Sequence, residues 1–247
     1  VGYGSWNTLD GQLAAGYETG SFTQNYVLGY HDGDGYREHA DSTRRGASGK
    51  WFYTFSGGAR AGLSLRLYRN KADEAGYLTL ASARGDPSQS YPFTATDGGD
   101  RRINQVSAHF DTPLGDTLSW SSLAWRNRLD DRRYVQFSAN VAQQERDADE
   151  THYGFSSTMT LRPEGRDLSV EWGLSGEWQD NIGQRYRTLN RARQATTRDQ
   201  HFQFDTIGGL VQAAFTPWSR LRLVTGWRVD KISGAVANPN SSAPSSA

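Results

Sequence analysis

Residues 151–179 read THYGFSSTMTLRPEGRDLSVEWGLSGEWQ, and this stretch decides the fold class. Larger apolar side chains alternate with small or polar ones on both sides of the turn-forming run at residues 162–167. A period of two indicates a strand with two different faces. Each arm of this hairpin has about 12 residues, whereas soluble strands commonly have about 5 to 6 and membrane-spanning strands about 9 to 11. The hairpin therefore predicts a transmembrane β-barrel with an apolar outer face and a polar lumen.

The same alternation recurs along the chain and predicts about ten strands. They span residues 5–17, 22–32, 50–55, 60–70, 102–111, 117–129, 151–161, 168–179, 204–215 and 220–232. In residues 117–129, Leu118 and Trp120 alternate out of phase with Leu123 and Trp125. A β-bulge would place all four side chains on one face, so we expect a bulge there.

The connections between these strands alternate between short and long. Tight turns fall near residues 19, 58, 114, 164 and 218, and long loops span residues 33–43, 71–101, 130–150 and 180–201. For the loop 130–150, an extension of the strand through residues 134–137 is the alternative. Outer-membrane barrels have short periplasmic turns and long extracellular loops. We therefore predict an all-β, antiparallel up-and-down transmembrane barrel, with residue 1 on the outer side because the first connection is short.

Composition excludes several other classes. The formal net charge is zero, which favours neither nucleic acid nor another polyanion as a partner. The sequence has no cysteine, so disulfides and thiolate metal sites are excluded. Mean hydropathy is −0.74, and no apolar run approaches the roughly 18 residues of a transmembrane helix. Many glycines and aromatic residues suit a barrel with aromatic girdles, but they also suit a soluble carbohydrate-binding sandwich.

Three short motifs resemble those of TonB-dependent outer-membrane receptors of the siderophore type. Residues 35–41, GYREHAD, resemble a motif at the outer end of an early barrel strand. Residues 3–6, YGSW, resemble the opening of the barrel, and residues 75–79, AGYLT, resemble a downstream extracellular loop in which Tyr77 replaces a common glycine. The motifs occur in the family's order, and the resemblance runs over most of residues 3–234.

This resemblance implies a barrel of about 22 strands filled by an N-terminal plug and energised by the inner-membrane TonB complex. Residues 1–234 would then be a fragment of the barrel domain, residues 235–247 a loop or truncated tail, and the plug would be absent from this chain. A fragment of a barrel would carry two unpaired, aggregation-prone edges.

Candidate ligand-binding residues lie in the predicted extracellular loops. They are Tyr36, Arg37, His39, Arg84, Tyr91, Arg101, Arg102, Arg185, Arg187, Arg191 and Arg193. The loop 180–201 also contains Arg198 and only two acidic residues, and an electropositive mouth would concentrate anionic chelates. Arginine offers planar, bidentate recognition of carboxylates. Alternatively, residues 35–37 hold a turn at the loop base, and the arginine-rich loop binds lipopolysaccharide or is simply solvated.

No catalytic constellation is present. The five histidines lack metal-ligand spacing, and no phosphate-binding or dinucleotide-binding motif occurs. The sequence therefore predicts neither an enzyme nor a resident cofactor or metal site, and no nucleic-acid partner.

Three functions remain open on the sequence. The first is TonB-energised uptake of a metal chelate, such as a ferric siderophore, across the bacterial outer membrane, with outer-membrane lipid or lipopolysaccharide and TonB (through the absent N-terminal region) as partners. The second is a passive porin or substrate-specific channel, which would lack a plug. The third is a soluble, secreted, glycan-binding β-sandwich, which would not require detergent. The substrate itself is not determined, because it is recognised by loops that vary on a constant scaffold.

Overall fold

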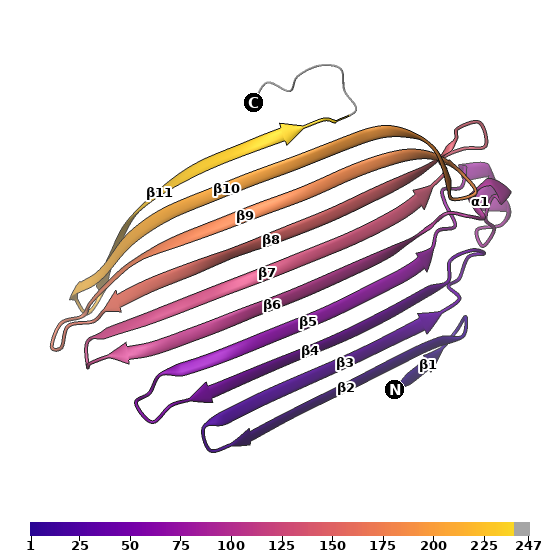
Figure 1. The fold of residues 1–247 in the computed structure, drawn as a ribbon. Helices are drawn as coiled ribbons and strands as arrows, with labels where there is room; N and C mark the ends of the chain where they lie inside the picture. Colours follow the sequence, from indigo (N-terminus) through magenta and orange to yellow (C-terminus); the bar gives the residue numbers. More distant parts are fainter. Residues whose placement is uncertain (240–247) are drawn as a thin grey trace.

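The structure, a computed structural model, describes residues 1–239. Within them the chain forms one antiparallel sheet of 11 strands whose spatial order follows the sequence (Figure 1). The strands are β1 (Gly2–Gly4), β2 (Thr8–Thr19), β3 (Phe22–Gly33), β4 (Ser42–Thr54), β5 (Arg60–Asp73), β6 (Gly98–Leu114), β7 (Leu118–Val135), β8 (Gln143–Leu161), β9 (Leu168–Leu189), β10 (Ala192–Trp218) and β11 (Leu221–Ala237). This order confirms the predicted all-β, up-and-down topology; β2 to β11 correspond to the ten predicted strands, and β1 is an added short strand.

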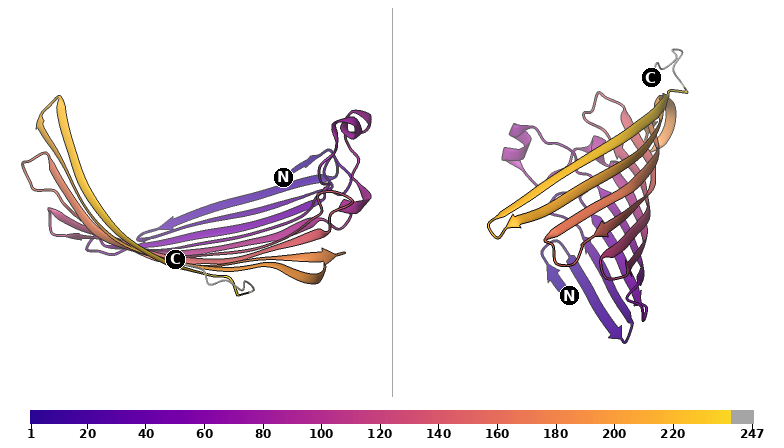
Figure 2. Two further views of the ribbon diagram at one scale, coloured as in Figure 1. Left: turned by 90° about the horizontal axis from the view of Figure 1, so that it is seen from above. Right: turned by 90° about the vertical axis from the view of Figure 1, so that its left-hand side faces the viewer.

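The sheet is strongly curved and open. Figure 2 shows a single layer with a convex and a concave side. In the described part of the chain the sheet does not close on itself, since β1 and β11 form its two edges. An edge strand presents unpaired backbone donors and acceptors, so both edges offer sites for further strand pairing.

The two ends of the sheet differ in their connections. Residues 5–7, 34–41, 74–97, 136–142 and 190–191 connect strands at one end, which we call the loop end (Figure 1). The short connections 20–21, 55–59, 115–117, 162–167 and 219–220 lie at the opposite, turn end. The connection 74–97 contains α1 (Leu80–Gly85) and a 3₁₀ turn (Pro92–Thr94), and the Thr79 side chain caps α1 by accepting the Ser82 N–H. No helix among residues 1–239 is long and apolar enough to cross a membrane.

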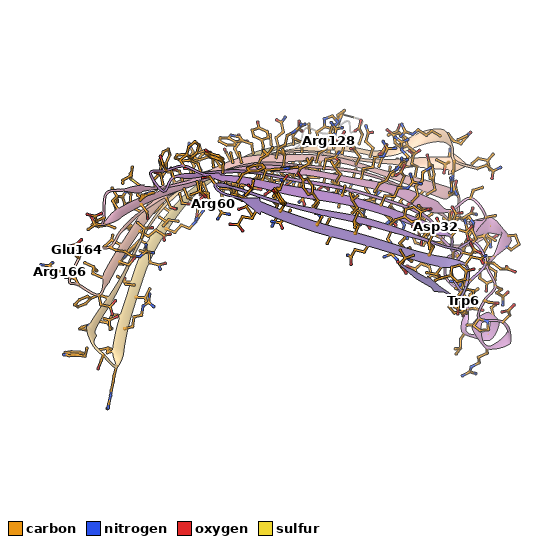
Figure 3. All side chains as sticks on the ribbon, turned by 90° about the horizontal axis from the view of Figure 1, so that it is seen from below. Trp6, Asp32, Arg60, Arg128, Glu164 and Arg166 are labelled. Atoms are coloured by element: carbon orange, nitrogen blue, oxygen red, sulfur yellow. The ribbon has the colours of Figure 1, made fainter. Side chains whose placement is uncertain are left out.

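Strand register separates the apolar from the polar side chains. Residues directly opposite one another in an antiparallel pair share a face. Met159 stands opposite Trp172, which stands opposite Val211, which stands opposite Trp227. Trp120 of β7 stands opposite Met159, and Arg128 lies on the same face of β7 as Trp120. Arg128 projects on the convex side of the sheet (Figure 3). The convex face therefore carries the apolar residues, and we call their continuous stretch the apolar band.

The apolar band is exposed rather than packed into a core. Trp227 is 77%, Val229 76% and Leu174 62% exposed. The apolar side chains that are buried in the described residues are Ala75, Val135, Tyr186 and Ala214. A soluble sandwich buries its apolar faces between two packed sheets. This single layer does not, so the fold does not favour the glycan-binding sandwich.

Two of the predicted long loops are wrong. Residues 130–150 mostly belong to β7 and β8, which are joined by residues 136–142. Residues 180–201 belong to β9 and β10, which meet in a tight turn at Asn190 and Arg191, both with positive φ. The strands run beyond the apolar band, where charged residues hide the alternation. There the convex side chains pair across strands, as Arg132 does with Asp147 at 3.1 Å and Arg193 with Glu145 at 2.7 Å.

The predicted β-bulge in residues 117–129 is also wrong. β7 pairs with β6 and β8 without a register shift, so Leu118 and Trp120 lie on the convex face while Leu123 and Trp125 lie on the concave face. Trp125 stands directly opposite Gly154. A Cβ at Gly154 would lie 2.6 Å from the Trp125 ring, so this glycine leaves the room that a tryptophan on the concave face needs.

Smaller differences concern strand ends. β4 starts at Ser42 rather than residue 50, and β6 starts at Gly98 rather than residue 102. Strand β11 continues to Ala237, so the first residues of the expected tail 235–247 are strand. The rest of that tail, from residue 240, lies outside the described residues.

Candidate functional site

Tyr36 and Arg37 anchor the connection 74–97 at the loop end. The Tyr36 hydroxyl donates to the Pro87 carbonyl at 2.5 Å. Arg37 Nη1 donates to the Gly76 carbonyl at 2.7 Å, and Nη2 donates to the Gln89 carbonyl at 2.9 Å. Backbone carbonyls thus occupy the guanidinium of Arg37, which ties the 34–41 connection to the neighbouring one.

Asp97 is the buried centre of the same assembly. Its side chain is fully buried; one carboxylate oxygen accepts the Gln136 N–H at 2.6 Å and the other accepts the Gln143 amide at 2.8 Å. His39 Nε2 lies 2.7 Å from the Asp97 carbonyl. Arg191 Nε donates to the Thr96 carbonyl at 2.8 Å. Burial raises the pKa of the Asp97 carboxyl, and the hydrogen bonds from Gln136 and Gln143 oppose that rise.

Tyr91 and Arg84 lie on the outer part of connection 74–97. The Tyr91 hydroxyl is 2.7 Å from the Ser82 hydroxyl and accepts the Thr79 N–H at 3.3 Å; these contacts lower the pKa of Tyr91. The Tyr91 ring stacks on Phe93 at a centroid distance of 5.2 Å. Arg84 stands in the last turn of α1.

The remaining predicted arginines divide between the two faces. Arg101 bonds Asp131 at 2.7 Å on the concave face, whereas Arg102 contacts Asp100 at 3.2 Å on the convex face. Arg185 and Arg187 lie on the concave face, and Arg193 turns to the convex face, where it pairs with Glu145. The residues predicted to form one arginine-rich loop therefore do not form one cluster.

Strand register instead builds a row of four arginines on the concave face. Arg133 of β7 stands opposite Arg146 of β8, Arg146 opposite Arg185 of β9, and Arg185 opposite Arg198 of β10. We call this set the concave arginine row. Sequence reasoning missed Arg133 and Arg146 because it assigned residues 130–150 to a loop. The available signal was the alternation of Gln144, Arg146 and Ala148 with the acidic residues between them.

The concave arginine row is incompletely neutralised. Arg133 pairs with Glu74 at 2.6 and 2.7 Å. Within residues 1–239, Arg146 and Arg185 form no ion pair, and the Nε of Arg146 is buried without a hydrogen-bond partner. The positive charges of Arg185 and Arg133 both act on the Arg146 guanidinium, and the negative charge of Glu74 opposes them. Like charges directly opposite in a sheet are destabilising, so the row favours a bound anion.

The chemistry available to this row is anion recognition. A guanidinium binds a carboxylate or phosphate through two parallel hydrogen bonds and keeps its charge at any physiological pH. No group of histidine, aspartate or glutamate side chains in the described part of the chain could hold a metal ion.

Solved structures share this architecture. The unliganded ferric citrate transporter FecA has a TM-score of 0.80 at 15% identity, covering 95% of this chain and 36% of FecA. The pyoverdine outer membrane receptor FpvA from Pseudomonas aeruginosa, bound to pyoverdine, scores 0.78 at 13% identity, covering 96% of this chain and 40% of FpvA. These proteins are TonB-dependent siderophore receptors. The chain has the fold of the TonB-dependent receptor barrel.

Further comparisons agree on this receptor-barrel fold. The ferric-catecholate import receptor Fiu from E. coli, in an open form, has a TM-score of 0.71 at 11% identity, covering 96% of this chain and 44% of Fiu. The chain thus spans less than half the length of these receptors. No protein-family model and no functionally curated protein matches the sequence.

The receptor-barrel fold gives the two sides of the sheet different surroundings. In a barrel of this kind the convex face meets lipid and the concave face lines the lumen. The concave arginine row then faces the lumen near the loop end. The apolar band, by contrast, faces outward.

Proposed function

We propose that this chain is part of an outer-membrane receptor that takes up an anionic metal chelate, with a ferric siderophore as the expected class. The concave arginine row carries the proposal, because it puts unneutralised guanidinium groups on the lumen face of a receptor-barrel fold. The solved relatives are transport receptors for ferric citrate, pyoverdine and catecholate chelates rather than enzymes. The exposed apolar band supports a location in the outer membrane.

TonB is the proposed source of energy. The fold likeness supports this step, since the similar structures are TonB-dependent receptors. The same fold supports a barrel of about 22 strands with a plug. Residues 1–234 would then contribute close to half of the barrel wall.

Two groups of residues are proposed to act on the chelate, one by direct contact and one by shaping the loop end. Arg185 and Arg187 lie on the lumen face and are proposed to contact it directly, together with Arg146 and Arg198. Tyr36, Arg37, His39 and Tyr91 are proposed to act by shaping connection 74–97, since their polar groups already bond to it.

Uptake of labelled iron tests the proposal. The full-length protein is expressed in a host that lacks its own siderophore receptors, and the cells receive radioactive iron as citrate, hydroxamate or catecholate chelates. We expect uptake of at least one anionic chelate, loss of uptake when the inner-membrane TonB complex is deleted, and loss when Arg146 and Arg185 are both changed to Gln. Uptake that persists without TonB would instead establish a passive porin or channel.

A further inference from the structure

Arginines on three neighbouring strands form a second row, on the convex face. Arg45 of β4 stands directly opposite Arg69 of β5, and Arg69 stands directly opposite Arg102 of β6. We call these residues the convex arginine row. Like charges in directly opposed positions cost stability in a sheet. The row therefore requires negative charge from elsewhere.

The protein supplies only part of that negative charge. Asp100 accepts from Arg69 at 2.9 and 2.6 Å and lies 3.2 Å from Arg102. Arg45 forms no ion pair within residues 1–239; its guanidinium lies 5.6 Å from the centre of the Tyr30 ring. One carboxylate thus serves two of the three guanidinium groups, and Arg45 has none.

The next acidic residues along the row are already paired. Asp130 of β7 stands opposite Arg102, and Asp149 of β8 stands opposite Asp130. Arg128 bonds both of these carboxylates, at 3.1 and 2.8 Å. Asp130 and Asp149 therefore do not neutralise the convex arginine row, and Arg45, Arg69 and Arg102 together keep a net positive charge.

A groove runs along the convex arginine row. It has a volume of about 340 Å³, and its lining includes Arg45, Ala47, Leu67, Arg69, Arg102 and Asn104. The side chains of Arg69 and Arg102 are 43% and 53% exposed, so their free donors are accessible. Leu67 stands opposite Ala47, which stands opposite Leu28. The groove therefore joins a cationic rim to the edge of the apolar band.

We propose that this groove binds the phosphate of a phosphorylated lipid of the outer leaflet, such as the lipid portion of lipopolysaccharide. The proposal rests on the membrane location proposed above. Guanidinium groups recognise phosphate through forked hydrogen bonds. The acyl chains would lie on Leu67, Ala47 and Leu28. A soluble anion would not contact these apolar side chains, whereas a phosphorylated lipid would contact both the arginines and the apolar side chains.

Lipid titration of the full-length protein, purified from outer membranes in non-ionic detergent, tests the proposal. Diphosphoryl lipid A is added, and bound lipid is counted by native mass spectrometry. We expect Arg45→Gln to weaken binding about tenfold, the effect of losing one hydrogen bond to a charged group. The triple change of Arg45, Arg69 and Arg102 to Gln should abolish it. Arg60→Gln, on the same strand as Arg69 but on the opposite face, should bind as the unchanged protein does.

Three results would overturn the inference: equal lipid binding by the unchanged protein and Arg45→Gln, equal binding of dephosphorylated lipid A, or displacement of the lipid by inorganic phosphate at equal concentration. If the triple variant fails to fold, Arg45→Gln still tests the inference. Arg45 forms no ion pair within residues 1–239, so its replacement removes no ion pair from the folded protein. A protein that is folded in the membrane but binds phosphorylated and dephosphorylated lipid A equally would refute this inference alone. A protein that carbonate washing removes from the membrane would refute the proposed function itself.

Discussion

Arg146 and Arg185 stand directly opposite each other on β8 and β9, with both side chains on the concave face. Arg133 and Arg198 extend the same row on either side. Repulsion between these guanidinium groups lowers the stability of the protein without ligand. An anion that binds between them relieves this repulsion, which increases the affinity for the anion. A functional site that is locally unfavourable is a common pattern in proteins.

Changing Arg185 to Gln should therefore have opposite effects on stability and binding. We expect the free energy of unfolding of the empty protein to rise by roughly 0.2–1 kcal/mol for each of the two like-charge pairs that are removed, with Arg146 and with Arg198. Affinity for the anionic chelate should fall about tenfold. Urea unfolding in detergent and quenching of tryptophan fluorescence by the chelate measure the two quantities. Arg166→Gln, in the turn 162–167, is the control; unchanged chelate affinity in Arg185→Gln would contradict the site.

Changing Arg37 to Ala should loosen connection 74–97 while the sheet remains intact. The substitution removes the donors to the Gly76 and Gln89 carbonyls. Hydrogen bonds from a charged donor contribute about 1.5–3 kcal/mol each, so amide exchange in residues 74–97 should accelerate at least tenfold. Arg84→Ala, within the same connection but outside these bonds, should leave exchange unchanged. Equal exchange in Arg37→Ala and the unchanged protein would show that Arg37 is free for another role.

Asp97 should give the loop end an unusual pH dependence. Burial raises its pKa above the ordinary value of 3.8, so the folded state takes up a proton before the unfolded state as the pH falls. This group therefore stabilises the folded connection increasingly as the pH drops through the raised pKa towards 3.8, and that contribution is lost as the pH rises. Comparing protection of the Gln136 amide between pH 7 and pH 4 in the unchanged protein and in Asp97→Asn isolates the effect. The difference in Gln136 amide protection between the unchanged protein and Asp97→Asn should narrow or reverse on acidification. A difference that stays constant between pH 7 and pH 4 would contradict a raised pKa of Asp97.

Gly154→Ala should destabilise the sheet. The added Cβ would lie 2.5 Å from the Gly176 carbonyl oxygen and 2.6 Å from the Trp125 ring. Overpacking of this kind costs about 1–3 kcal/mol, which a lower urea midpoint in detergent would show. Gly183→Ala is the matched control on the same face, because nothing lies within 4 Å of its Cβ position. Equal midpoints for the two variants would mean that Trp125 has room to move aside.

Sequence reasoning succeeded where each strand carries its own signal. The alternation from Tyr153 to Met159 and from Val170 to Trp178 identifies two strands, their apolar face and the turn between them. Residues 130–150 lacked an apolar alternation, because Arg132, Asp147 and their neighbours are charged; only the alternation of acidic residues with others near Arg146 remained as a signal. Their pairing is visible only when two strands are placed side by side. The bulge expected near Trp125 failed for the same reason, since the compensating glycine lies on the adjacent strand.

The sequence by itself therefore determined the fold class, the ten long strands and the apolar side of the sheet, because alternation is a local property of a single strand. Only the tertiary structure decided which arginines meet. Arg146 comes from one strand and Arg185 from the next, and register places them opposite each other while it turns Arg193 to the other face. A shift of one residue moves a whole strand's side chains to the opposite face, so the binding face depends on pairings that no single segment encodes.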